Sequence, residues 1–170
     1  MRYLPVLFLL ASPALADTHT FQVYSYQRGA GPCHSHTWAV FTRTAPDGRQ
    51  SQVTISWMPA ARVGGVIPGR NWTQAETLAH AHRIGAQVFQ WGPYPCSADL
   101  WERARQQATE LSSGRVQYVA LDRRTRPGAM NCISAVLMVT GERVWTRTAH
   151  GHKASAIVVG ELLRCNTGKE

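Results

Sequence analysis

The sequence predicts an α+β fold, in which an antiparallel sheet with an N-terminal β-hairpin packs on a buried helix. Alternating segments in the first third of the chain are typical of strands. Two later segments have helix-capping residues and apolar stripes, and residues 132–140 are apolar enough for a helix that is buried on every side. The length of 170 residues suits one domain with one core.

The first sixteen residues have the pattern of a secretory signal. A basic start at Arg2 precedes a short apolar run, and Ala14-Leu15-Ala16 is a typical cleavage signal. The run is too short to cross a bilayer, and no later apolar stretch is long enough. We therefore expect an exported protein, periplasmic or secreted, with signal peptide 1–16, a single domain 17–170 and no transmembrane segment.

Several segments are rich in β-formers or alternate between apolar and polar residues. The expected strands are residues 21–26, 37–42, 52–57, 87–91 and 116–121. Pro46-Asp47-Gly48 is a strong turn signal that joins the second and third strands into a hairpin. Counting residues outward from this turn places His36 near Ser56.

Helices are predicted from caps and periodicity, and the segments between the elements from Gly and Pro. Thr73 and Glu76 form a capping box, and Gly85 ends that helix. The expected helices are residues 73–85, 97–111, 132–140 and 154–163. Residues 58–71 are expected to form a loop, and residues 92–95 a turn.

Cys132 is expected to begin the buried helix, with Asn131 as N-cap and Gly141 as C-cap. At a helix start, free N–H groups and the dipole favour a thiolate, so a pKa below the usual value of about 8.5 is expected. A short apolar run does not reveal its period. Residues 135–139 equally suit a buried strand that returns through residues 143–146.

Four cysteines follow the signal: Cys33, Cys96, Cys132 and Cys165. Because an exported chain meets an oxidising compartment, two disulfides are the plain expectation. If Cys132 is a nucleophile, it stays free and Cys33 pairs with Cys96 or with Cys165.

The composition restricts partners and cofactors. The net charge of +8 suits an anionic partner such as an envelope polymer, although a solvated basic surface would give the same value. No nucleic-acid-binding motif is present. Cys33, His34 and His36 are too few to predict zinc, so no metal or cofactor is expected. His80 and His82 face different directions on a helix and cannot chelate one metal together. His150 and His152 are candidates for ligands or for surface residues, and the surface is the expected place.

Cys132 and a histidine together suggest nucleophilic catalysis, with His36 or His34 as general base. The segments His36-Thr37-Trp38-Ala39-Val40 and Asn131-Cys132 occur in an order that resembles the circularly permuted NlpC-type branch of papain-like cysteine hydrolases. In that branch the histidine strand precedes the cysteine helix. The resemblance covers residues 35–140 and implies a permuted papain-like fold. It also implies peptidase, amidase or acyltransferase chemistry, often on cell-wall peptides or lipids.

The resemblance also implies a third polar residue on the strand after the histidine. Gln52, Thr54 and Ser56 are candidates, and Ser56 lies nearest His36 by hairpin counting. Serine is a departure from the family pattern, because it orients imidazole less firmly than Asp, Asn or Gln. Two hypotheses result. One is an exported thiol hydrolase that acts on cell-envelope peptides or acyl groups. The alternative is a non-catalytic, disulfide-stabilised secreted domain that binds an anionic envelope component. The oligomeric state is not predicted.

Overall fold

The computed structural model describes residues 16–29, 35–60, 66–120, 128–141 and 151–166. Within these residues the fold is α+β, as predicted. The elements are β1 (Thr18–Gln27), β2 (Ser35–Thr44), β3 (Gln50–Ile55), β4 (Trp57–Pro59), β5 (Val66–Asn71), α1 (Gln74–Arg83), β6 (Gln87–Pro95), α2 (Ala98–Ser112), β7 (Gln117–Val119), β8 (Ala129–Met130), α3 (Cys132–Leu137), the 3-10 helix η2 (Met138–Thr140) and α4 (Gly151–Asn166).

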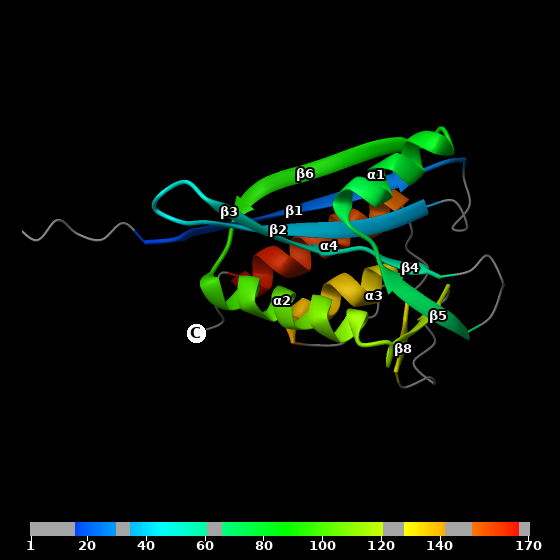
Figure 1. The fold of residues 1–170 in the computed structure, drawn as a ribbon. Coiled ribbons are helices and arrows are strands. Elements are labelled where there is room, and N and C mark those ends of the chain that lie inside the picture. Colours follow the sequence, from blue (N-terminus) through cyan, green and yellow to red (C-terminus); the bar gives the residue numbers. More distant parts are fainter. Residues whose placement is uncertain (1–15, 30–34, 61–65, 121–127, 142–150, 167–170) are drawn as a thin grey trace, which may run out of the picture.

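The larger sheet is antiparallel, with strand order β3-β2-β1-β6. β2 and β3 form the predicted hairpin, in which Phe41 pairs with Val53. β2 is buried along most of its length, since helices cover the sheet on both faces. Figure 1 shows α1 on one side of the sheet, and α2, α3 and α4 on the other.

Alternation along β2 divides the core between these two faces. Ala39 and Phe41 join the larger cluster, which includes residues of α2, α3 and α4. Trp38 and Val40 join the smaller cluster with Ala81 of α1. Among the described residues the larger cluster has twenty buried members and the smaller has five. Most of the apolar burial that stabilises the fold is therefore on the α2–α4 face.

A second small sheet has the order β4-β5-β7-β8, and it corrects the prediction of a loop over residues 58–71. Within that range β4 pairs antiparallel with β5. The Gly and Pro residues of this segment predicted a loop, but Gly69 is needed for packing within a strand and does not mark a loop. A Cβ on Gly69 would lie only 2.0 Å from a ring carbon of Trp57, so no side chain fits there.

The predicted turn at residues 92–95 is also wrong, because β6 continues to Pro95 as an edge strand. Proline is tolerated on an edge strand, where a missing N–H need not break a ladder. The register between β1 and β6 shifts between Phe21 and Val23, and the pairing then continues to Pro95. This edge strand leads directly into α2.

The helix caps follow the sequence signals. Thr73 and Glu76 form the predicted capping box of α1. α3 begins at Cys132, with the Asn131 side chain accepting from the Ser134 amide, and η2 ends at Gly141 with φ of 81°. The strand alternative for residues 135–139 does not occur, and its predicted return through residues 143–146 lies outside the described residues. α4 begins three residues before the predicted start at Ala154.

The signal-peptide prediction falls almost wholly on residues outside the described ranges, since the description begins at residue 16. It stays a prediction, as does the division into residues 1–16 and 17–170. Among the helices that the structure describes, none combines the length and the apolar character needed to cross a membrane.

Candidate functional site

Cys132 lies at the start of α3 and is almost completely buried, with 9% of its surface exposed. Backbone N–H groups of Thr37, Ile133 and Cys132 itself lie at the sulfur and stabilise a thiolate. Burial opposes them more strongly, so the pKa of the Cys132 thiol is raised above its ordinary value. The expected low pKa is therefore wrong, because helix-start amides do not outweigh the loss of solvent around a buried sulfur.

The contact with Thr37 locates the sulfur relative to the sheet. Pairing between β2 and β3 ends at Ala39 and Ile55, so the first residues of β2 do not pair with β3. The N–H of Thr37 lies close enough to the Cys132 sulfur to favour its charged form. Since the peptide nitrogen of Thr37 is bonded to the carbonyl carbon of His36, the sulfur lies beside the backbone that carries His36.

His36 is buried on the α1 side of the larger sheet, with 2% of its surface exposed. Its Nε2 lies 2.8 Å from Ser56 Oγ. Its ring centroid is 5.5 Å from that of Tyr26 and 5.7 Å from that of Trp38. Burial, and then repulsion from His80, lowers the pKa of His36 to about 3. The ring is therefore neutral at pH 7, and together with the raised pKa of the Cys132 thiol this disfavours a resting thiolate–imidazolium pair.

Ser56 lies between β3 and β4, where the chain passes from one sheet to the other. Its amide donates to Asn71 Oδ1 at 2.8 Å, and its hydroxyl lies 2.7 Å from Thr77 Oγ1 of α1. Of the three candidates for the third site residue, Ser56 is the one bonded to His36. Gln52 and Thr54 lie further along β3, opposite Thr42 and Val40.

The structure thus brings the predicted site residues to one end of β2, but not into a continuous chain. His36 and Ser56 are hydrogen-bonded. The amide that follows His36 favours the charged form of the Cys132 sulfur. In the described part of the chain, no hydrogen bond joins the Cys132 sulfur to the His36 ring. Cys132 and the hydrogen-bonded pair of His36 and Ser56 are therefore neighbours only through the peptide group between His36 and Thr37.

The other cysteines bear on the disulfide prediction. Cys96, Cys132 and Cys165 are free thiols in the structure. Cys33 and His34 lie outside the described residues, so a disulfide from Cys33 to Cys96 or Cys165 stays a prediction. Burial raises the pKa of Cys96 to about 11, which makes this thiol a poor nucleophile.

His152 corrects a prediction, because it is not a surface histidine. It is half-buried in the first turn of α4, and its Nδ1 lies 2.9 Å from the hydroxyl of buried Ser25. Its ring centroid lies 3.7 Å from that of Phe89 on β6. The early start of α4 explains the difference, since it places residue 152 on a helix that packs on β1. His150 lies outside the described residues.

Sequence reasoning missed two residues of the site, Thr37 and Thr77. Thr37 contributes a backbone amide, which no side-chain pattern reveals. Thr77 follows the cap residue Thr73 by four positions in α1, where a threonine hydroxyl can bond the carbonyl one turn back. The capping box fixed the start of the helix and could have directed attention to this position.

Among the described residues, no three or more His, Cys, Asp or Glu side chains gather in a way that could hold a metal ion. Comparison with protein-family models, with curated proteins and with solved structures gives no significant match. The chemistry of the site is therefore inferred from its own residues.

Proposed function

We propose that this chain is an exported thiol hydrolase, with a permuted papain-like arrangement of its catalytic residues. Cys132 is the nucleophile, His36 the general base, and Ser56 orients the imidazole. One observation carries the proposal. The buried sulfur lies against the amide that follows His36, while the His36 ring is hydrogen-bonded to Ser56. A nucleophile, a neutral base and an orienting hydroxyl thus occur at one end of one strand.

The first chemical step begins from a neutral thiol and a neutral imidazole. The directions of the two pKa shifts argue against a resting ion pair, since burial disfavours both charged forms. The S–H proton of Cys132 must therefore pass to His36 as the sulfur attacks the acyl carbon. Cys132 belongs to the cluster on the α2–α4 side of the sheet, whereas the His36 ring lies on the α1 side. The transfer therefore needs the first residues of β2, which do not pair with β3, to rearrange when substrate binds so that the imidazole reaches the sulfur.

The tetrahedral intermediate then collapses to a thioester. The imidazolium of His36 returns its proton to the leaving amine or alcohol, and the carbon–nitrogen or carbon–oxygen bond breaks. Water attacks the thioester, with His36 again accepting a proton, and the acid leaves as the Cys132 thiol re-forms. The N–H groups of Cys132 and Ile133 lie close enough to the sulfur to favour its charged form, so they also lie near the place where the oxyanion would develop.

The charge of the chain favours an anionic substrate, such as a cell-envelope peptide or an acylated envelope polymer. The net charge is +8. Each of the seven acidic residues in the described ranges forms an ion pair with an arginine. These pairs leave the acidic side chains compensated, so an anionic polymer would meet little repulsion from them.

The test is acylation of the protein that starts at Asp17, using 4-nitrophenyl acetate as the probe. We expect a burst of 4-nitrophenol and an acetyl adduct that peptide mapping assigns to Cys132. Cys132→Ser should lose the burst. His36→Gln should slow it strongly, because glutamine keeps an N–H donor for Ser56 but cannot take the thiol proton. Peptidoglycan fragments should then be screened for released amines or acids.

Cys96→Ser and Cys165→Ser are the matched controls, since each removes a cysteine that lies outside the candidate site. Both should retain the wild-type burst. An adduct distributed over several cysteines, or a burst that His36→Gln leaves unchanged, would contradict the hydrolase. The non-catalytic domain that binds an anionic envelope component would then be the better reading, and its affinity for anionic polymers would be measured directly.

A further inference from the structure

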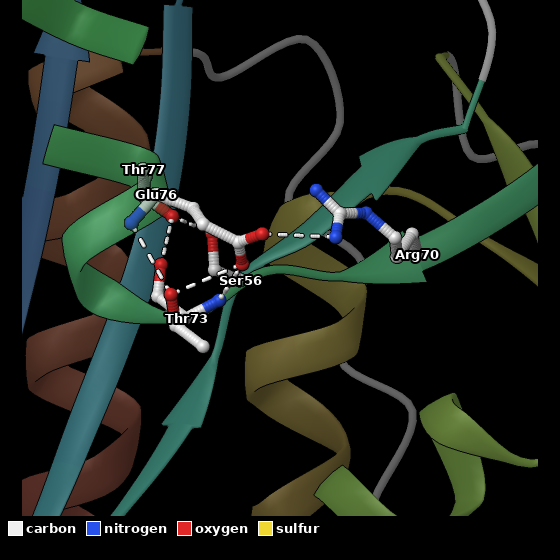
Figure 2. A network of polar contacts seen from close by, with 5 residues as sticks. All are labelled: Ser56, Arg70, Thr73, Glu76 and Thr77. Carbon is white, nitrogen blue, oxygen red and sulfur yellow. Dashed lines mark hydrogen bonds and ion pairs between the residues drawn. The ribbon is translucent and has the colours of Figure 1, made fainter. Parts of the chain in front are cut away.

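A line of buried hydroxyl groups connects His36 to the first turn of α1. His36 Nε2 lies 2.8 Å from Ser56 Oγ, and Ser56 Oγ lies 2.7 Å from Thr77 Oγ1. The Thr77 hydroxyl donates to the Thr73 carbonyl at 2.8 Å. Figure 2 shows the last two of these contacts within the polar network at the start of α1. Ser56 and Thr77 are completely buried, so each proton in this line belongs to a definite bond.

The protons can be assigned from the end of the line. A carbonyl oxygen only accepts, so the single hydroxyl proton of Thr77 is used in its bond to Thr73. The contact between Ser56 and Thr77 therefore uses the proton of Ser56. Ser56 has no second proton, so its oxygen must accept from His36. Nε2 of His36 then carries the hydrogen, and Nδ1 carries the lone pair.

We propose that Thr77 is a positioning residue, which acts through Ser56 to hold His36 as the Nε2–H tautomer and leaves Nδ1 as the nitrogen that accepts the thiol proton. The catalytic part of this inference rests on the proposed hydrolase. The tautomer itself does not, because it follows from hydrogen-bond distances alone. In the part of the chain that the structure describes, Nδ1 of His36 has no hydrogen-bond partner, as the proposal requires of a nitrogen kept for the proton.

The start of α1 is built to hold Thr77 in place. The Glu76 carboxylate accepts from the Thr73 amide at 2.8 Å, and the Glu76 amide donates back to the Thr73 hydroxyl at 3.2 Å. Arg70 donates to the other carboxylate oxygen of Glu76 at 2.9 Å. The Thr73 carbonyl also accepts the Thr77 amide, so it is fixed by the helix itself. Figure 2 shows Thr73, Glu76 and Thr77 together at the first turn, with Arg70 reaching Glu76 from β5.

The tautomer is measured by long-range ¹H–¹⁵N NMR of protein labelled with ¹⁵N-histidine, at pH 7 and without substrate. His36 is identified by the signals that His36→Gln removes. We expect the wild-type ring to show a protonated Nε2 and an unprotonated Nδ1. A wild-type ring protonated at Nδ1 overturns the proposal, whatever any variant does.

Thr77→Val removes the hydroxyl and keeps the shape of the side chain. Ser56 is then free to turn its proton toward His36, and we expect mixed tautomer signals and an acylation burst about three- to tenfold slower. Thr77→Ser keeps the hydroxyl and should restore both readouts. Ser56→Ala, which removes the middle of the line, should mix the tautomers as Thr77→Val does.

The outcomes separate this inference from the proposed function. Unchanged tautomer signals in Thr77→Val would reduce Thr77 to a packing residue and overturn the inference, even if acylation by Cys132 stands. If Thr77→Val and Thr77→Ser changed the tautomer signals and slowed the acylation burst equally, the inference would also be overturned. If the His36 ring is protonated at Nε2 and Thr77→Val mixes its tautomers, but the protein shows no acylation, the positioning role of Thr77 is supported and the hydrolase is contradicted.

Discussion

The two faces of the larger sheet use the same strands for different purposes. The α2–α4 face holds the larger cluster, built around Phe21, Phe41, Leu100 and Leu162, and it includes Cys132. The α1 face has a much smaller apolar cluster, and beside it lies the line of polar groups from His36 to Thr73. The members of both clusters are buried, and so are His36, Ser56 and Thr77.

This contrast indicates a division between stability and positioning. Apolar burial contributes free energy in proportion to area, so the α2–α4 face dominates the stability of the fold. Buried polar groups contribute little net stability. Each one nevertheless fixes the orientation of its hydrogen-bond partners, because a buried donor or acceptor without a partner costs free energy. A substitution on the first face should therefore change the free energy of unfolding. One on the second face should mainly change the state of the histidine.

The largest expected effect is on the α2–α4 face. Phe41 is completely buried in the larger cluster, and Phe41→Ala should lower the free energy of unfolding by about 3–5 kcal/mol. Urea unfolding followed by tryptophan fluorescence measures this loss. Thr77→Val on the other face should cost clearly less. Equal losses from the two substitutions would contradict the division between the faces.

Acid should act through the α1 face. The folded-state pKa of His36, about 3, lies below the unfolded value of about 6.5, so protonation favours the unfolded chain. Stability from this residue is complete above pH 6.5 and is lost as the pH falls toward 3. At pH 5 the loss should be about 2 kcal/mol relative to neutral pH.

The matched control for the acid effect is His36→Gln, which cannot titrate in this range. Its free energy of unfolding should decline less between pH 7 and pH 5 than that of the wild type. His152→Gln serves as a second control, because His152 is the half-buried histidine of the opposite face. If His36→Gln retains the full acid loss, burial of His36 as a neutral ring is not its cause.

The next prediction concerns the rate at which the Cys132 thiol is alkylated, and it involves no change in stability. Because burial raises the pKa of its thiol, iodoacetamide should alkylate Cys132 more slowly than free cysteine at pH 7.5, with a rate that still climbs above pH 9. Mass spectrometry of the modified peptides follows each thiol separately. In urea the difference should vanish. Fast alkylation of Cys132 in the folded protein at pH 6 would mean that the amides around the sulfur outweigh its burial.

The same division explains how much could be predicted from the sequence. Alternation and capping signals identified β1, β2, β3, α1 and α2, because those elements satisfy local rules. Hairpin counting brought Ser56 to His36 for the same reason. β4 and β5 were missed because they contain Pro59, Pro68 and Gly69, residue types that usually mark loops, and because only the packing shows that Gly69 makes room for the Trp57 ring of the neighbouring strand.

Protonation states were the least predictable part of the site. The sequence shows a cysteine at a helix start, where amides favour a thiolate, and the expected low pKa follows from that local rule. The actual direction depends on how completely α3 and the sheet exclude solvent, which is a property of the assembled core. The neutral state of His36 has the same origin, since its burial requires β2, Ser56 and α1 together.

The smallest expected effect is on stability, and it distinguishes the cap of α1 from the line of hydroxyl groups that joins α1 to His36. Thr73→Ala removes the capping hydroxyl and should lower the free energy of unfolding by about 1 kcal/mol. The carbonyl of residue 73, which accepts the Thr77 proton, belongs to the backbone and remains. The His36 ring should therefore keep its Nε2–H signals in Thr73→Ala, whereas Thr77→Val changes them at a similar cost in stability. If Thr73→Ala mixes the tautomers as strongly, the histidine responds to the stability of α1 in general, and the proton of Thr77 has no special part in positioning it.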